Sequence, residues 1–402
     1  MTLQPASAAP TTKPGERPAL LLGRAWLPAV DGPIVVTVRD GQVIDITSTL
    51  APTVRDVCEM ADPAGYVAGV PGQPIGSLAA LLADSAVASF STNPVDAAGL
   101  RERPWLLAPI DLQAVKASGV TFVVSLLERV IEEQAKGSPE KAASIRNDIH
   151  TLIGHDLSKL VPGSAQAMQI KQALIAKGVW SQYLEVGIGP DAEIFTKSQP
   201  MSAVGPGADI GILSTSTWNN PEPEIAVVVA STGRIVGATL GNDVNLRDVE
   251  GRSALLLGKA KDNNASCALG PFIRLFGDGF TLDDVKQAEI RLTVDGPEGY
   301  RLEGASSMSQ ISRSPESLVG AAMGANHQYP DGFVLFLGTM FAPIQDRDVA
   351  GQGFTHKIDD LVSIETTSLG RLVNRVRHCD DCPPWVFGVS HLMRSLASRK
   401  LL

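Results

Sequence analysis

Two glutamates, Glu222 and Glu224, stand two residues apart where the chain enters the apolar run 225–230. Side chains two residues apart in a β-strand point to the same face, and their Cα atoms lie roughly 6–7 Å apart. Two carboxylates at this spacing can converge on one hard cation such as Mg²⁺. Pro223 between them has no N–H to donate, which places the pair at a strand entrance or a sheet edge. Taken alone, such a pair is more often a solvated strand end than a metal site.

A hairpin is predicted to bring a third acid to this pair. The run 225–230 is followed by the turn residues 231–233 and by a second β-type run, 234–239. Antiparallel pairing about that turn places Asp243 opposite about position 221, beside Glu222. Three unpaired carboxylates would raise one another's pKa, and a bound divalent cation removes this repulsion. Oxygen ligands favour Mg²⁺, with Mn²⁺ or Ca²⁺ as alternatives, so we predict a metal site formed by Glu222, Glu224 and Asp243.

Lys259 follows the three acids closely in the sequence. A lysine beside a metal site can neutralise a substrate carboxylate or an enolate, or transfer a proton. A phosphate-binding loop is excluded, because Gly251 lies too far before Lys259 and Ala260 stands where Ser or Thr is required. Lys259 is therefore a candidate catalytic and substrate-binding residue, and a surface lysine is the alternative.

The elements that must position these residues follow from composition and pattern. A chain of 402 residues can form two domains. Residues 1–18 are rich in Ala, Pro and Thr and are predicted to be a disordered tail. Residues 19–105 contain a strong hairpin signal at Asp40-Gly41 and are predicted to form a small N-terminal domain. Residues 106–402 are dominated by strands and turns without regular βαβ alternation, which favours an α+β catalytic domain.

Several classes of protein are excluded by composition. The formal net charge of −9 argues against nucleic-acid binding, which requires basic residues against the phosphates. No apolar run approaches the roughly 20 residues of a membrane span. Four cysteines do not form a disulfide framework, and Cys379-Asp-Asp-Cys382 lacks the second pair that a zinc site needs. We therefore expect a cytoplasmic protein that binds neither nucleic acid nor membrane.

Four motifs, in order over roughly 105–402, resemble the fumarylacetoacetate hydrolase superfamily. Its pattern is E-x-E, then N-D-x-S-A-R-D, then K-x-x-D before G-P, and finally G-T. The corresponding stretches here are Pro221-Glu222-Pro223-Glu224, Leu240–Asp248, Gly258–Asp262 with Gly270-Pro271, and Leu337-Gly338-Thr339. The resemblance implies a mixed β-roll with flanking helices that assembles as homodimers or homotetramers. It also implies Mg²⁺ on the three acids, and substrate contacts from Lys259, Gly338 and Thr339.

One departure from the family pattern bears on the chemistry. Many relatives carry N-Y-x-x-H-x-x-E, in which a His–Glu dyad activates water. The equivalent stretch here keeps Glu128 but has Ser125 in place of the histidine. Water attack on a carbonyl is doubtful without that base, whereas a lone carboxylate still suits proton abstraction and return. We therefore assign Glu128 as the candidate catalytic acid–base and Ser125 as a candidate substrate-binding residue.

The whole-chain resemblance is closest to the sugar-acid dehydratases of this superfamily. It implies a Mg²⁺-dependent hydro-lyase acting on a small 2-keto acid, a 2-keto-3-deoxy-D-pentonate derived from D-xylonate or D-arabinonate, to give α-ketoglutarate semialdehyde. Two alternatives remain open. One is an acylpyruvate-type C–C hydrolase or an oxaloacetate decarboxylase using the same metal, and the other is a non-catalytic metal-binding scaffold.

Overall fold

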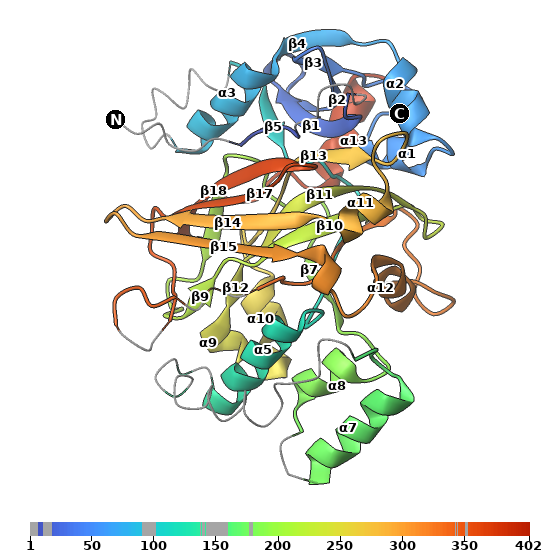
Figure 1. Cartoon of the computed structure of the whole chain (residues 1–402). Coiled ribbons are helices and arrows are strands. Elements are labelled where there is room, and N and C mark those ends of the chain that lie inside the picture. The colour runs from blue at the N-terminus through green and yellow to red at the C-terminus, as the bar shows by residue number, and fades with distance from the viewer. Residues whose placement is uncertain are drawn as a thin grey trace.

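The structure is a computed structural model that describes residues 7–10, 18–90, 102–136, 138, 141, 160–176, 180–341, 343, 345–349 and 353–402. It is an α+β arrangement of mixed β-sheets with flanking helices (Figure 1), which confirms the predicted fold class. Among the described residues, no helix has both the length and the apolar character needed to cross a membrane.

The N-terminal part, coloured blue in Figure 1, consists of short strands and helices. Its strands are β1 (Leu21–Leu27), β2 (Gly32–Arg39), β3 (Gln42–Asp45), β4 (Gln73–Ser77) and β5 (Trp105–Leu107). Its helices are the 3₁₀ turn η1 (Pro28–Val30), α1 (Val54–Glu59), α2 (Pro63–Gly69) and α3 (Leu78–Phe90). The predicted hairpin is present, with Arg39 paired to Gln42 and with Asp40 and Gly41 at φ 48° and 72°, as a type I′ turn requires.

The rest of the chain supplies the longer strands and the remaining helices. The strands are β6 (Ala114–Ser118), β7 (Ile194–Ser198), β8 (Asp209–Ile212), β9 (Asn219–Asn220), β10 (Pro223–Val229), β11 (Ile235–Asp243), β12 (Asn245–Leu246), β13 (Cys267–Leu275), β14 (Glu289–Asp295), β15 (Arg301–Ser307), β16 (Phe333–Phe336), β17 (Leu361–Thr366) and β18 (Gly370–His378). The helices are α5 (Val123–Ala135), α7 (Ala165–Ala176), α8 (Gln182–Ile188), α9 (Arg247–Glu250), η3 (Ala254–Leu256), α10 (Leu257–Lys261), α11 (Leu282–Lys286), η4 (Met308–Gln310), α12 (Pro315–Ala322) and α13 (Val389–Ser398).

Two large sheets organise these elements. The larger has the order β4-β3-β2-β1-β13-β11-β10-β16-β6-β7, with β5 pairing to β1. The second has the order β15-β14-β17-β18-β8, and β12 pairs with β9 in a small third sheet. The strands of the N-terminal part thus continue into the central sheet through the β1–β13 pairing. The domain boundary expected at residue 105 stays a prediction.

Strand β10 lies at the centre of the large sheet and is buried on both faces. Ile225, Val227 and Val229 pack into the core that also contains side chains of β14, β17 and β18. Ala226 and Val228 face the other way, into the core that contains side chains of α1 and α2. Side chains alternate along a strand, so Glu224, the second residue of β10, continues the face of Ala226 and Val228. The acid pair is therefore anchored to one of the most buried strands of the protein.

The β10–β11 hairpin forms in the register that the sequence predicts, to within one residue. Pro223 pairs with Asn242 and Glu224 with Gly241. Beyond the end of the ladder, the Asp243 N–H donates to the Glu222 carbonyl at 3.1 Å, and the Glu222 N–H donates to Asn242 Oδ1 at 3.0 Å. These bonds fix the backbone of Asp243 directly opposite that of Glu222.

The predicted disordered tail is wrong for residues 7–10. The backbones of Ala8 and Arg371 exchange hydrogen bonds of 2.9 and 2.8 Å, and Ser7 Oγ accepts from the Val373 N–H at 3.0 Å. The segment therefore pairs with the first residues of β18, which precede the residues of β18 that pair with β8. Main-chain pairing of this kind requires no apolar pattern, which is why the composition of the segment did not indicate it. Residues 1–6 and 11–17 lie outside the described residues.

Candidate metal centre

Three carboxylates meet at the end of the β10–β11 hairpin. Glu222, Glu224 and Asp243 each offer an oxygen atom, and these atoms all lie within 4.8 Å of one another. All three side chains are buried, with each residue 1% exposed. Acidic side chains almost never occur fully buried unless they are paired. The sequence prediction that the hairpin gathers these three acids matches the arrangement in the structure.

Gly338 and Thr339, the two residues of the G-T motif, lie against Glu224. The Gly338 N–H donates to Glu224 Oε2 at 2.7 Å, and the Thr339 hydroxyl donates to Glu224 Oε1 at 3.1 Å. Gly338 has φ 103°, and a Cβ there would meet Thr121 Oγ1 at 2.0 Å, so the turn requires glycine. In this structure Gly338 and Thr339 hold a candidate metal ligand in place, and Thr339 also reaches the adjoining cavity.

Two buried lysines neutralise Asp243. Lys261 Nζ lies 3.1 Å from Asp243 Oδ2 and 2.5 Å from Glu222 Oε2, so it bridges two of the three acids. Lys197 Nζ lies 2.9 Å from Asp243 Oδ1. The Lys197 ammonium also donates to the carbonyl oxygens of Val244 (3.1 Å) and Lys261 (2.5 Å). Lys197 on β7 is fully buried, and these carbonyl bonds fix its head group.

Helix α5 adds a guanidinium to the same cluster. Arg129 is hydrogen-bonded to Glu222 Oε1 and also lies 3.2 Å from Glu250 Oε2 on α9. Both acids and the arginine are buried. Arg129 is the residue next to Glu128, and the sequence pattern gave no reason to prefer it over the other charged positions of this helix.

Lys259, the lysine chosen from the sequence, does not reach the triad. Its side chain is exposed on α10, and its carbonyl accepts a bond from the Asn263 side chain at 2.9 Å. Lys261, two residues further along the same short helix, is 2% exposed and bridges Glu222 and Asp243. Residues two apart on a helix point in nearly opposite directions, so only one of the two lysines can face the site. The structure thus brings Lys261, and not Lys259, to the three acids.

Glu128 and Ser125, the two residues assigned from the sequence to catalysis and substrate binding, both lie on α5. Glu128 is buried, and its Oε2 lies 3.4 Å from Nη2 of Arg247, whose guanidinium stacks over the Trp218 ring at 4.3 Å. Among the described residues, those that line the cavity at the triad do not include Glu128. The backbone of Ser125 is helical, and its side chain lies outside the described residues. The roles given to these two residues stay predictions.

A small cavity adjoins the triad. Its volume is about 10 Å³, which is room for about one water molecule or ion. The charged residues that line it are Arg129, Glu193, Glu222, Asp243, Glu250 and Lys261. Glu193, which just precedes β7, packs against Gly119, where a Cβ would meet Glu193 Oε2 at 1.8 Å. Sequence reasoning missed Glu193, because it lies 29 residues before Glu222 in an ordinary-looking strand start.

Burial and charge perturb the acids of this cluster in different directions. Burial, then the charges of Asp243 and Glu222, raise the pKa of Glu224 well above its usual range. Burial opposes ionisation of Asp243 as well, but the Lys197 and Lys261 ammonium groups outweigh it and lower the pKa of Asp243. Burial, followed by the charge of Glu250, raises the pKa of Glu193 to about 7. A further cation among these oxygens would relieve the repulsion that Glu224 experiences, so the donor set fits a hard divalent ion.

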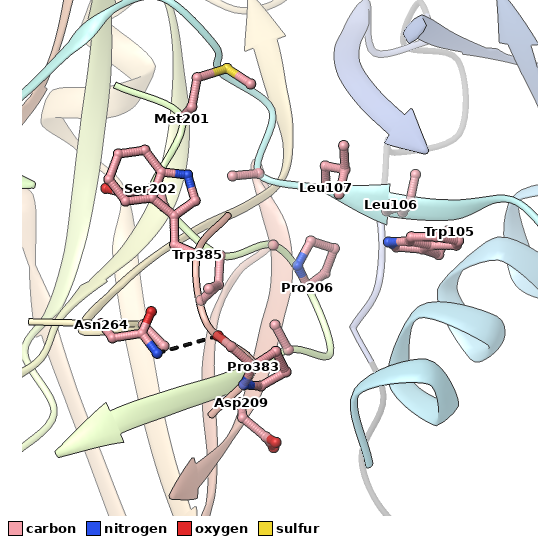
Figure 2. A pocket seen from close by; sticks show the side chains of 16 residues that line it. Trp105, Leu106, Leu107, Met201, Ser202, Pro206, Asp209, Asn264, Pro383 and Trp385 are labelled. Carbon is pink, nitrogen blue, oxygen red and sulfur yellow. Dashed lines mark hydrogen bonds between the residues drawn. The ribbon is translucent and has the colours of Figure 1, made fainter. Parts of the chain in front are cut away.

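A larger cavity of about 370 Å³ lies elsewhere, where β5 faces the loop 201–208 and the C-terminal segment (Figure 2). Its wall is mostly apolar and includes Trp105 and Trp385. Its one carboxylate, Asp209, is already ion-paired with Arg375 at 2.8 Å, and the Asn264 amide donates to the Pro383 carbonyl at 3.2 Å. This cavity offers apolar surface without a converging set of ionisable groups, so we place the candidate chemistry at the triad.

The fold and site define a mixed-β protein with a buried three-carboxylate cation centre at the end of a hairpin. Residues 181–377 match the family model described as fumarylacetoacetate (FAA) hydrolase C-terminal. The chain therefore carries a domain of the fumarylacetoacetate hydrolase family, as the motifs had indicated. The matched range contains the triad, both buried lysines and Glu193.

Two curated relatives have detectable sequence similarity to this chain. The 2-dehydro-3-deoxy-D-arabinonate dehydratase of Saccharolobus solfataricus (strain P2) is 33% identical over 188 residues, which are 46% of this chain and 58% of the relative. A protein of Haloferax volcanii named "Probable 2-keto-3-deoxyxylonate dehydratase" is 31% identical over 194 residues, which are 48% of this chain and 63% of the relative. The matches therefore span less than two thirds of either relative.

A solved structure shares the fold over most of the chain. It is a 2-keto-3-deoxy-D-arabinonate dehydratase complexed with magnesium and 2,5-dioxopentanoate, at a TM-score of 0.58 and 23% sequence identity. The similarity covers 89% of this chain and 99% of that one. It thus includes residues outside the matched domain and extends the common fold towards the N-terminal part.

Proposed function

We propose that this protein is a divalent-metal-dependent dehydratase that removes water from a 2-keto-3-deoxy-pentonate. The observation that carries the proposal is the buried triad of Glu222, Glu224 and Asp243, with Lys261 and Glu193 beside it at one cavity. Three named proteins support the substrate class, since two curated relatives are named as dehydratases of such acids and a structural neighbour holds magnesium and 2,5-dioxopentanoate.

The three acids of the triad would hold the cation, and the other charged residues would act on the substrate. A bound divalent ion of this kind, Mg²⁺ by our proposal, polarises a keto oxygen and makes the adjacent C3 proton more acidic. The Lys261 ammonium would balance the negative charge that develops on that oxygen. Arg129 would add positive charge on the side of α5.

Proton transfer is the task of a carboxylate whose pKa lies near the working pH. Glu193 meets this condition, because its pKa is raised to about 7 and it lines the cavity. Glu193 as carboxylate would take the C3 proton, and Glu193 as acid would return a proton to the C4 hydroxyl as it leaves. Loss of water would leave a double bond between C3 and C4. Transfer of protons from C5 and its hydroxyl group to C3 and C4 would then give 2,5-dioxopentanoate, which is α-ketoglutarate semialdehyde. Glu128, our assignment from the sequence, lies against Arg247, which favours a positioning role.

The proposed reaction is tested by product analysis. The protein is incubated with Mg²⁺ and, in separate samples, with 2-keto-3-deoxy-D-xylonate, an acylpyruvate and oxaloacetate. Nuclear magnetic resonance then separates an aldehyde product from a cleaved acid or from released CO₂. Formation of the semialdehyde from the pentonate alone is the expected result. Cleavage of the acylpyruvate or decarboxylation of oxaloacetate would replace the proposal by that activity, and no turnover of any of the three would favour a metal-binding scaffold.

Replacing Glu193 by glutamine should lower turnover by about 10²-fold, because the amide can neither accept nor return the proton. Glu193→Gln should still bind Mg²⁺, since Glu193 is not one of the triad. The matched variant Glu128→Gln should keep more of the turnover than Glu193→Gln does. The measurement is the steady-state rate at saturating substrate together with a Mg²⁺ titration of each variant. A larger loss in Glu128→Gln would return the acid–base role to Glu128.

The raised pKa of Glu193 also predicts a pH-dependent difference in stability. In the folded protein Glu193 binds its proton up to about pH 7, whereas in the unfolded chain it loses it near its ordinary value of 4.5. The folded state therefore holds more protons between these values, and its stability falls as the pH rises through that window. Glu193→Gln lacks this loss, so in EDTA its melting temperature should exceed that of the parent protein at pH 8 by a few degrees and match it near pH 4.5. Glu289→Gln, on an exposed residue of β14, is the control; an equal offset at both pH values would contradict the prediction.

We further propose a cytoplasmic protein that assembles as a homodimer or homotetramer. All four cysteines are free thiols, as suits a reducing compartment. Exposed apolar side chains gather in the C-terminal segment, where Trp385, Val386, Val389 and Met393 are each at least 40% exposed. Exposed apolar side chains in one segment would suit a protein–protein contact. Light scattering of the purified protein measures the assembly directly, and a monomeric mass would exclude it.

A further inference from the structure

The carboxylate oxygens of the triad all have protein partners, and these partners differ in kind. Both oxygens of Glu224 accept from uncharged donors, the Gly338 N–H and the Thr339 hydroxyl. The oxygens of Glu222 and Asp243 instead lie against cations. A metal ion bound by all three acids would therefore lie beside positive charge already held at Glu222 and at Asp243, and would be repelled by it.

Among the described cations of the cluster, Lys261 is the one that contacts two members of the triad. Its ammonium lies between Glu222 Oε2 (2.5 Å) and Asp243 Oδ2 (3.1 Å). The outer oxygens of the same two acids are held by Arg129 and Lys197. The Lys261 head group thus neutralises both Glu222 and Asp243, and an ion held by these two acids would compete with it.

The Lys261 head group differs from that of Lys197 in having carboxylates, and no backbone carbonyl, among its described hydrogen-bond partners. The Lys197 ammonium is tied to two backbone carbonyls, and Arg129 is shared between Glu222 and Glu250. The Lys261 head group donates to Glu222 and Asp243, and it lies 5.6 Å from the centre of the Phe195 ring at the cavity wall. A lysine head group on a four-carbon stem can move several ångströms by changing rotamers.

The charges around the cavity agree with such an exchange. Four carboxylates (Glu222, Glu224, Asp243 and Glu250) face three cations (Arg129, Lys197 and Lys261). A divalent ion would raise the net charge of this cluster by two. A monocarboxylate such as a 2-keto acid would then be attracted more strongly to the metal-loaded site than to the metal-free one.

We propose that the Lys261 ammonium competes with a divalent ion for Glu222 and Asp243, and that it turns to the substrate when these two acids hold the ion. Lys261 therefore competes with the metal before the substrate arrives and binds the anionic substrate afterwards, so that the metal must bind first. This inference rests on the proposed function, since it assumes that the triad binds a divalent ion.

The experiment is a calorimetric titration of the purified full chain with Mn²⁺ and with Mg²⁺. Lys261→Met removes the competing charge, so the metal should bind at least tenfold more tightly than in the parent protein, while the 2-keto acid should bind more weakly to the metal-loaded variant. Lys259→Met is the matched control, because it removes an exposed lysine two residues away, and its metal affinity should be unchanged.

Two further variants separate charge from packing. Lys261→Gln keeps a polar side chain without the charge and should also bind metal more tightly, whereas Lys261→Arg keeps the charge and should not. If Lys261→Met does not fold, the competition is tested with Lys261→Gln and Lys261→Arg instead. Equal or weaker metal binding in folded Lys261→Gln would overturn the competition. A parent protein that binds neither metal would instead refute the proposed function, and the two failures are thus distinguishable.

Discussion

Glu224→Gln should bind Mg²⁺ at least about 10²-fold more weakly than the parent protein and should lose at least about 10³-fold in turnover. The variant removes one of three anionic ligands, and the Lewis-acid contribution of a bound ion is worth several kcal/mol, where each 1.36 kcal/mol is tenfold in rate. The loss should persist at Mg²⁺ concentrations that saturate the parent protein, because a weakened site also holds the ion less rigidly.

The same variant should keep its fold, which makes the result interpretable. The amide oxygen of glutamine can accept from the Gly338 N–H, and its NH₂ group can donate to the Thr339 hydroxyl, so both present neighbours remain satisfied. Burial and the neighbouring charges already raise the pKa of Glu224, so a neutral side chain at this position relieves repulsion. In EDTA the melting temperature of Glu224→Gln should therefore equal or exceed that of the parent protein. Parent-like Mg²⁺ binding in this variant would remove Glu224 from the metal site.

The hairpin shows how far local sequence logic can reach. The apolar run after Glu224, the turn closed by Gly233 and the second β-run allow only a few registers, and one of them places Asp243 beside Glu222. The period of two along a strand then places both glutamates on one face. Because β10 is apolar and buried on both faces, its side-chain pattern alone does not fix the register; the short turn between the two strands does.

The residues that surround the triad could not be obtained in the same way. Lys197 and Glu193 come from the region of β7, and Arg129 comes from α5, so tertiary packing alone brings them to the hairpin. A sequence pattern assigns charged residues to the surface. Lys261 differs from exposed Lys259 only in the direction in which its side chain points from a five-residue helix. Such short helices have no periodic stripe long enough to identify the buried face.

Lys197→Met should destabilise the metal-free protein by about 3–5 kcal/mol, because breaking a buried ion pair leaves an uncompensated charge. Lys197 is fully buried, and its loss would leave Asp243 with one cation fewer and the Val244 and Lys261 carbonyls without this donor. The measurement is chemical denaturation in EDTA, so that bound metal adds nothing to the stability.

Two comparisons identify the cause of that loss. Lys116→Met, on the neighbouring strand β6, removes a half-exposed lysine whose described bond goes to Thr196 at 2.8 Å, and it should change stability by no more than about 0.5 kcal/mol. The double variant Lys197→Met/Asp243→Asn removes both charges of the pair and should be less destabilised than the sum of the single variants. Additive losses would mean that Lys197 stabilises the protein through its hydrogen bonds to the two carbonyl groups, and that Lys261 alone balances the negative charge of Asp243.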